Sequence, residues 1–232
     1  LTGGSVTAVN DVDAARAGQV AAGLPGAVTY PTAQELIADG NVDAVLVASW
    51  GPAHEEQVVA SIAAGKPVFC EKPLAPSSAA CQRIMDAEMT AGRRLVQVGF
   101  MRRYDAGYRA MKAALEDGGI GAPLLMHCAH RNPSVPDYFT TDMIISDSAV
   151  HEIDIVRWLF GEEITAAAVL RPRRSTHAPD GLADPLIQVL PWIFEIQPSI
   201  VFVGLSNAVD TSSRTPGRSR IARIESSSKL IG

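Results

Sequence analysis

Short apolar runs alternate with longer helical segments over the first hundred residues. The runs are rich in Val and other residues typical of buried strands, and the segments between them repeat apolar positions at helical spacing. Gly23, Gly65 and Gly92 follow three of these segments, as is common at helix C-termini. The pattern predicts strands over residues 5–10, 42–49, 68–70 and 94–99, and helices over residues 13–22, 33–38, 54–64 and 77–91. Strands separated by helices favour a parallel sheet with both faces covered.

The rhythm changes from about residue 103. Helices are predicted over residues 105–116 and 148–160, and strands over residues 124–130, 164–171 and 186–190. The last two strands have no helix between them, which is typical of an α+β domain built on an open sheet. After Leu190 the pattern changes again, and residues 206–232 are rich in Ser, Arg and Gly, a composition that favours disorder or poor packing. We therefore expect three parts: residues 1–102, residues 103–190, and an aberrant or poorly ordered tail over residues 191–232.

Composition and charge exclude several classes of protein. With 47% hydrophobic and 19% charged residues the chain can bury a core, and its net charge of −5 gives no reason to expect a nucleic-acid partner. Its apolar runs are shorter than the roughly 18 residues of a spanning helix, and the first residues do not resemble a secretory signal. We therefore expect no membrane contact and a cytoplasmic location. Cys70, Cys81 and Cys128 are expected to be free thiols.

The first candidate for chemistry is Asp11, which follows the first predicted strand. An acidic residue there can accept hydrogen bonds from both ribose hydroxyls of NAD and repels the 2′-phosphate of NADP. Alternatively, Asp11 or Asp13 caps the next helix. The glycine-rich loop that normally lies some 20 residues upstream is missing, and Gly3-Gly4 is only a loop dipeptide. We therefore expect the first strand and the glycine-rich loop to be missing and cofactor binding to be weakened.

A second candidate is the triplet Glu71-Lys72-Pro73, which follows a short buried strand. Ligands of open α/β sheets bind at the carboxyl ends of the strands, so Lys72 is placed to donate to a substrate hydroxyl and to stabilise a developing alkoxide. The alternative is a solvated surface lysine.

The third candidate is the pair Asp147 and His151, which lie four residues apart and would share one face of a helix. His151 can act as a general base, with Asp147 beside it raising its proton affinity and orienting the substrate. Alternatively, Asp147 interacts with the helix dipole and His151 only packs. His130 and Asn132 alternate along a strand end and can offer hydrogen bonds to a polyol. His127 and His130 would lie on opposite faces of a strand, so we expect no metal site.

In this order the segments resemble the Gfo/Idh/MocA family of oxidoreductases, from about residue 6 to about residue 190. The Glu71-Lys72-Pro73 turn and the pair Asp147 and His151 are similar to the family's motifs. Residues 48–55, 98–105 and 130–133 are most similar to its inositol 2-dehydrogenase members. Family members are longer than this chain, and the resemblance is expected to stop after Ile187.

The resemblance implies an incomplete α/β Rossmann domain followed by an incomplete α+β domain with an open, mainly antiparallel sheet. It implies NAD-dependent oxidation of a ring hydroxyl, myo-inositol to 2-keto-myo-inositol, in a homo-oligomer that is a dimer or tetramer. Another sugar or polyol dehydrogenase, or an inactive fragment that keeps only the scaffold, are the alternatives. By the resemblance, the catalytic residues are Lys72, Asp147 and His151, the cofactor-binding residues are Asp11, Ser49, Trp50, His54, Glu71 and Lys72, and the substrate-binding residues are Lys72, His130, Asn132, Asp147 and His151.

Overall fold

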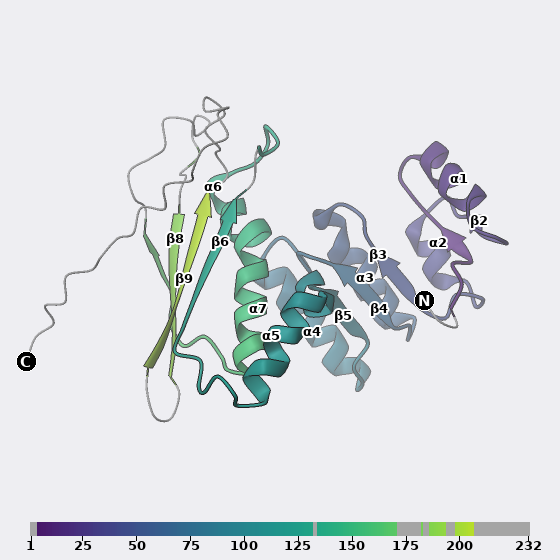
Figure 1. Cartoon of the computed structure of the whole chain (residues 1–232). Coiled ribbons are helices and arrows are strands. Elements are labelled where there is room, and N and C mark those ends of the chain that lie inside the picture. The colour runs from purple at the N-terminus through teal and green to yellow at the C-terminus, as the bar shows by residue number, and fades with distance from the viewer. Residues whose placement is uncertain (1–3, 132–133, 171–181, 183–185, 194–197, 207–232) are drawn as a thin grey trace, which may run out of the picture.

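The structure is a computed structural model that describes residues 4–131, 134–170, 182, 186–193 and 198–206. Strands and helices alternate in its first part (Figure 1). The elements are β1 (Ala8–Val9), α1 (Ala14–Ala22), β2 (Val28–Thr29), α2 (Ala33–Ala38), β3 (Val45–Val47), α3 (His54–Ala63), β4 (Val68–Glu71), α4 (Ser78–Ala91) and β5 (Val96–Gly99). The predicted Rossmann-type α/β fold is confirmed, while the sequence pattern missed the short strand β2.

All strand pairs of this part are parallel, in the orders β1-β2 and β3-β4-β5. In the described residues these strands form two sheets, because no described strand joins β1 to β3. Val45, Val47 and Cys70 of the larger sheet pack against Val58 of α3 and Ile84 of α4 in one buried cluster. The core therefore fixes the carboxyl ends of β3 and β4. The candidate residues Ser49 and Trp50 follow β3, and Glu71 and Lys72 lie at the end of β4.

Polar caps decide where these helices begin. The side chain of Asp13 accepts hydrogen bonds from the amides of Ala15 and Arg16, at 3.0 and 3.2 Å. Asp13 is therefore the N-cap of α1, and Asp11 is not. Asp11 instead accepts a bond from the amide of Asp13 at 2.8 Å, so it holds the turn between β1 and α1.

The second part is built on a mixed four-stranded sheet with helices on one face. Its elements are a 3₁₀ turn η2 (Met101–Tyr104), α5 (Ala106–Glu116), β6 (Leu125–Arg131), α6 (Thr141–Met143), a π-helical segment η3 (Ile144–Ala149), α7 (Val150–Phe160), β7 (Ala168–Leu170), β8 (Leu186–Ile193) and β9 (Pro198–Ser206). The strand order is β6-β9-β8-β7, with β6 and β9 parallel and the other two pairs antiparallel. This agrees with the mainly antiparallel sheet that was expected.

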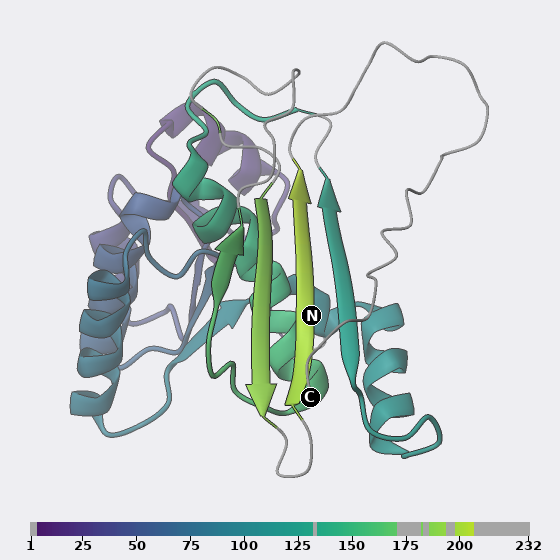
Figure 2. The same ribbon diagram turned by 90° about the vertical axis from the view of Figure 1, so that its left-hand side faces the viewer.

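Helix α7 lies between the two parts of the molecule, with α5 beside it (Figure 1). Ile155, Val156 and Leu159 of α7 are fully buried and pack in one cluster with Ile144 of the π-helical segment. Figure 2, which looks onto the sheet, shows α7 behind its strands and α5 beside the edge strand β6. The position of α7 matters for the site, since its first turn carries His151.

The ordered sheet extends farther along the chain than the sequence predicted. Strand β8 continues to Ile193, and β9 lies within the residues expected to form a tail. β9 pairs with β6 on one side and β8 on the other, and its run of β-branched and aromatic residues favours a strand. Residues 207–232 lie outside the described residues. No described helix is long and apolar enough to cross a membrane.

Candidate active site

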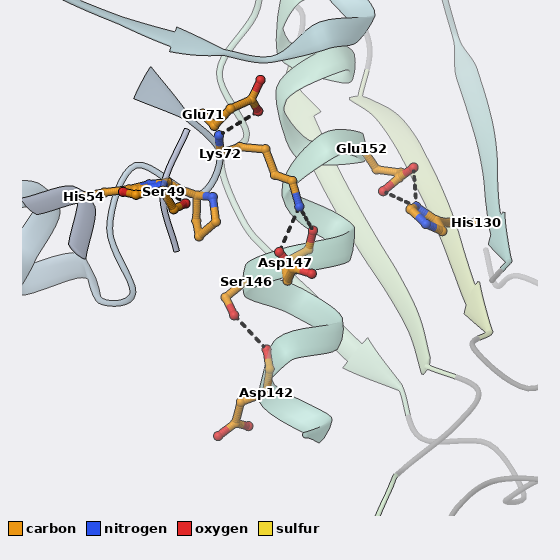
Figure 3. A network of polar contacts seen from close by, with 10 residues as sticks. Ser49, His54, Glu71, Lys72, His130, Asp142, Ser146, Asp147 and Glu152 are labelled. Carbon is orange, nitrogen blue, oxygen red and sulfur yellow. Dashed lines mark hydrogen bonds and ion pairs between the residues drawn. The ribbon is translucent and has the colours of Figure 1, made fainter. Parts of the chain in front are cut away.

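Lys72 and Asp147 meet although 75 residues separate them. Lys72 follows β4 at the carboxyl edge of the parallel sheet, and Asp147 lies in the π-helical segment before α7. The Lys72 Nζ donates to Oδ1 of Asp147 at 2.8 Å and to its carbonyl oxygen at 3.1 Å (Figure 3). The two side chains come from different parts of the molecule, so their contact marks a site between them.

A π-helical segment, which the sequence pattern did not predict, carries Asp147. Residues 144–149 are wound more loosely than an α-helix, and the change to α-helix at Val150 falls between Asp147 and His151. The carboxylate of Asp147 pairs with Lys72 instead of the imidazole. π-helical turns inside helices occur often at functional sites, and this one includes a candidate residue.

The expectation that Asp147 raises the proton affinity of His151 is wrong. Burial lowers the pKa of His151 below its usual 6.5, and the positive charges of Lys72 and Arg102 lower it further. Glu152 opposes this effect, whereas Asp147 is not among the groups that shift it. The side chain is 8% exposed, and among the described residues its Nδ1 has no hydrogen-bond partner. His151 is therefore neutral at pH 7, the form that can accept a proton.

Two adjacent arginines of η2 attach α7 to the turn that follows β5. Arg102 Nη1 lies 2.5 Å from Oε1 of Glu152, and Arg103 Nε donates to Oδ2 of Asp154 at 2.9 Å. Both carboxylates are almost completely buried. These ion pairs hold the helix that carries His151 against the loop after β5. The sequence pattern did not predict these pairs. Glu152 and Asp154 inside the otherwise apolar helix α7 were the signal that buried cations lie nearby.

His130 of β6 lies close to the carboxylate of Glu152. Its Nδ1 is 3.2 and 3.4 Å from the two oxygens of Glu152 (Figure 3). His130 thus points toward the α7 side of the sheet, as the proposed substrate site requires. Asn132, its predicted partner, lies outside the described residues.

The expected cofactor residues lie at the carboxyl ends of β1, β3 and β4. Ser49 and Trp50 follow β3, Glu71 ends β4, and Trp50 is 76% exposed. The buried ring of His54 lies with both nitrogens 2.8 Å from carbonyl oxygens, those of Pro73 and Ser49. His54 therefore connects the loop after β3 to the turn that carries Lys72.

An NAD molecule fits this donor set chemically. Three groups lie on the ligand edge that open α/β sheets use: the Asp11 carboxylate, which also lies 3.8 Å from Arg16, the exposed indole of Trp50 and the Glu71 carboxylate. The thiols of Cys70 and Cys128 are poor nucleophiles, since burial raises their pKa to about 12 and about 11. Among the described residues no group of three or more His, Cys, Asp or Glu could hold a metal ion.

Two family models match the chain. One, described as an oxidoreductase family with an NAD-binding Rossmann fold, matches residues 2–100, and the Gfo/Idh/MocA C-terminal domain matches residues 108–202. The chain belongs to the Gfo/Idh/MocA family. The second match ends inside β9, so the family's C-terminal domain includes residues beyond Leu190.

Relatives within the Gfo/Idh/MocA family carry related names. The chain is 49% identical to inositol 2-dehydrogenase 3 of Saccharopolyspora erythraea, over 97% of this chain and 66% of that protein. It is 49% identical to an inositol 2-dehydrogenase of Pseudomonas fluorescens, over 97% and 67%. The chain spans about two thirds of the length of these curated relatives. Coverage this broad also extends past Ile187, where the resemblance was expected to stop.

A solved structure is similar to this chain in fold as well. The myo-inositol dehydrogenase from Lactobacillus casei, in complex with NAD(H) and myo-inositol, has a TM-score of 0.81 and 38% identity to this chain. The similarity covers 89% of this chain and 61% of the other.

Proposed function

We propose that this chain supplies the catalytic group of an NAD-dependent dehydrogenase that oxidises a ring hydroxyl of a cyclic polyol, converting myo-inositol to 2-keto-myo-inositol. The observation that carries the proposal is the contact of Lys72 Nζ with Asp147, 2.8 Å long, next to a helix whose first turn holds a neutral His151. The names of the relatives, and the NAD(H) and myo-inositol of the Lactobacillus casei complex, support the substrate and the cofactor.

In the proposed reaction His151 accepts the proton of the substrate hydroxyl. Burial keeps the imidazole unprotonated at neutral pH, which a general base needs. The Lys72 ammonium donates to the same oxygen and stabilises its developing negative charge. Asp147 holds the ammonium in place through the 2.8 Å contact. The three residues thus divide proton removal, charge stabilisation and orientation among them.

The residues proposed to hold the cofactor are Asp11, Ser49, Trp50 and Glu71, with Lys72 next to them in the chain. His54 contributes by holding the loop after β3 in place, through the contacts of its ring with the carbonyl oxygens of Ser49 and Pro73. The carboxylate of Asp11 favours NAD over NADP, because it repels a 2′-phosphate. When bound, NAD supplies the acceptor for the hydride that leaves the substrate carbon. The residues of this chain bind and orient the reacting groups.

His130 and Asn132 are proposed to bind the polyol beside Lys72. Another ring polyol or sugar is the alternative substrate within the same chemistry. A panel of myo-inositol, scyllo-inositol and glucose separates these possibilities by their relative kcat/KM.

We also propose that the enzyme works in the cytoplasm as a dimer or tetramer assembled through the open sheet. Its described helices α5 and α7 lie on one side of that sheet (Figure 2), which leaves the other face for a second copy. The free thiols of Cys70, Cys81 and Cys128 fit a reducing compartment. Light scattering coupled to size-exclusion chromatography measures the assembly directly, and a monomer at every concentration would contradict it.

The function is tested by NADH formation at 340 nm with each polyol. We expect the highest kcat/KM with myo-inositol, and a turnover lower by about 10²–10⁴-fold in His151→Ala if the imidazole is the general base. An unchanged rate in that variant would contradict the assignment of His151 as the general base. Absence of NADH with every polyol would favour the alternative of a scaffold without catalysis.

A further inference from the structure

One buried histidine lies between two segments that the proposed mechanism needs. His54 begins α3 and is 1% exposed. Its Nδ1 lies 2.8 Å from the carbonyl oxygen of Pro73, and its Nε2 lies 2.8 Å from that of Ser49 (Figure 3). Carbonyl oxygens only accept hydrogen bonds, so each ring nitrogen that carries a hydrogen donates it to one of these two segments. The buried ring therefore serves the main chain around it rather than a bound dinucleotide.

The two carbonyl oxygens belong to segments with different tasks. Ser49 follows β3 and precedes Trp50, and both are proposed to hold the cofactor. Pro73 follows Lys72 directly, in the turn that carries the ammonium proposed to stabilise the alkoxide. The far end of this lysine is anchored separately, where Nζ donates to Asp147 at 2.8 Å. The main chain of the turn and the end of the side chain are thus held by different elements, α3 and the π-helical segment.

The loop after β3 has a second contact with α3. The Ser49 hydroxyl donates to Oε1 of Gln57 at 2.7 Å. Losing the Nε2 contact of His54 would therefore leave this loop a side-chain bond to the same helix. We expect its displacement to be moderate.

We propose that His54 is a positioning residue with two separable tasks: its Nδ1 contact fixes the Lys72 turn for the chemical step, and its Nε2 contact fixes the loop that takes the cofactor. The kinetic half of this proposal rests on the proposed function, because it takes Lys72 as the group that stabilises the developing alkoxide. The positions of the two segments do not depend on any substrate. They can therefore be tested separately from the reaction.

Two amide side chains separate the tasks. The amide nitrogen of Asn lies as many bonds from Cα as Nδ1 of His, and that of Gln lies as many as Nε2. Both amide nitrogens are hydrogen-bond donors. His54→Asn is therefore expected to keep the contact with Pro73 and to lose that with Ser49. His54→Gln is expected to do the reverse.

NMR of the folded chain measures both positions without substrate or cofactor. The indole N–H of Trp50 reports on the loop after β3, and the side-chain ¹⁵Nζ and ¹³Cε signals of Lys72 report on the turn. Trp50→Phe and Lys72→Met assign these signals. We expect His54→Asn to shift mainly the Trp50 signal and His54→Gln to shift mainly those of Lys72. The same pattern of shifts in both variants overturns the proposal.

Ser61→Ala is the matched control. Ser61 is also buried in α3, at 0% exposure, and its hydroxyl donates to the carbonyl oxygen of Gln57 at 2.8 Å. This variant loses a buried bond of the same helix and is expected to leave the Trp50 and Lys72 signals in place. If either amide variant does not fold, His54→Met fills the space without a donor and is expected to shift both sets of signals. A folded Met variant with both sets unmoved overturns the proposal.

Steady-state kinetics with NAD and myo-inositol then separate kcat from KM. His54→Gln is expected to lower kcat by about fivefold to tenfold, the loss of one hydrogen bond, with KM for NAD almost unchanged. His54→Asn is expected to keep kcat and to raise KM for NAD by a smaller factor, because the bond between Ser49 and Gln57 remains. Equal changes of kcat in the two variants overturn the proposal. NMR signals that separate as expected in a chain that forms no NADH would contradict the proposed function and support the positioning role.

Discussion

Replacing Asp154 by Asn removes the buried half of an ion pair that joins α7 to the loop after β5. The Asp154 side chain is 4% exposed and that of Arg103 is 35% exposed. Removing one partner of a buried pair costs about 3–5 kcal/mol, because the other charge stays behind uncompensated. Arg103 keeps some contact with water and Asn keeps a carbonyl oxygen, so we expect the lower end, about 3 kcal/mol. For a chain of this size that lowers the melting midpoint by about 6–12 °C.

The matched control is Glu163→Gln, which breaks a second arginine–carboxylate pair at the end of the same helix. Arg157 donates two bonds to Glu163, at 2.9 and 2.6 Å, so the geometry resembles that of Arg103 and Asp154. The two side chains are 43% and 75% exposed, and water screens such pairs. We expect an almost unchanged midpoint in thermal unfolding followed by circular dichroism. Equal midpoints for the two variants would refute the reasoning that burial decides the contribution of these pairs.

Three further predictions concern the site. Lys72→Met is expected to lower kcat by about 10²–10³-fold through loss of charge stabilisation. Its melting midpoint is expected to change little, because the pair of Lys72 with Asp147 is partly exposed. A normal kcat in this variant would show that Lys72 takes no part in the chemistry. Because burial lowers the pKa of His151 below 6.5, the acid limb of kcat/KM is expected below pH 6.5, and a limb above that value would contradict the assignment. The unfolded chain takes up this proton first, so the contribution of His151 to stability is present above pH 6.5 and is lost as pH falls from that value through the lower pKa of the folded protein. Asp11→Ser is expected to raise kcat/KM with NADP relative to NAD, and an unchanged ratio would place Asp11 outside the ribose site.

The sequence predicted those parts of the fold that depend on local pattern. The apolar run over residues 42–49 contains strand β3, whose Val45 and Val47 are buried. Helices such as α4 begin at a Ser cap and end at a glycine with positive φ. The sequence also placed Lys72 at the carboxyl edge of the sheet. These features require only a few neighbouring residues.

The features that the sequence did not predict depend on contacts between distant segments. The π-helical segment over residues 144–149 carries Asp147, and no periodicity in the sequence shows such a local change of winding. The pairs Arg102 with Glu152 and Arg103 with Asp154 join residues about 50 positions apart. Strand β9 is set by pairing with β6 and β8 on its two sides. Tertiary contacts decide each of these features.

The central claim is that Lys72, Asp147 and His151 oxidise an inositol hydroxyl by transferring hydride to NAD. The most direct measurement uses myo-inositol deuterated at carbon 2, with NAD, followed by proton NMR of the reduced nicotinamide. We expect the deuterium to appear at carbon 4 of the nicotinamide and the transfer to be lost in His151→Ala. Deuterium that stays in the polyol or is released to water, with the unmodified protein, would contradict the claim.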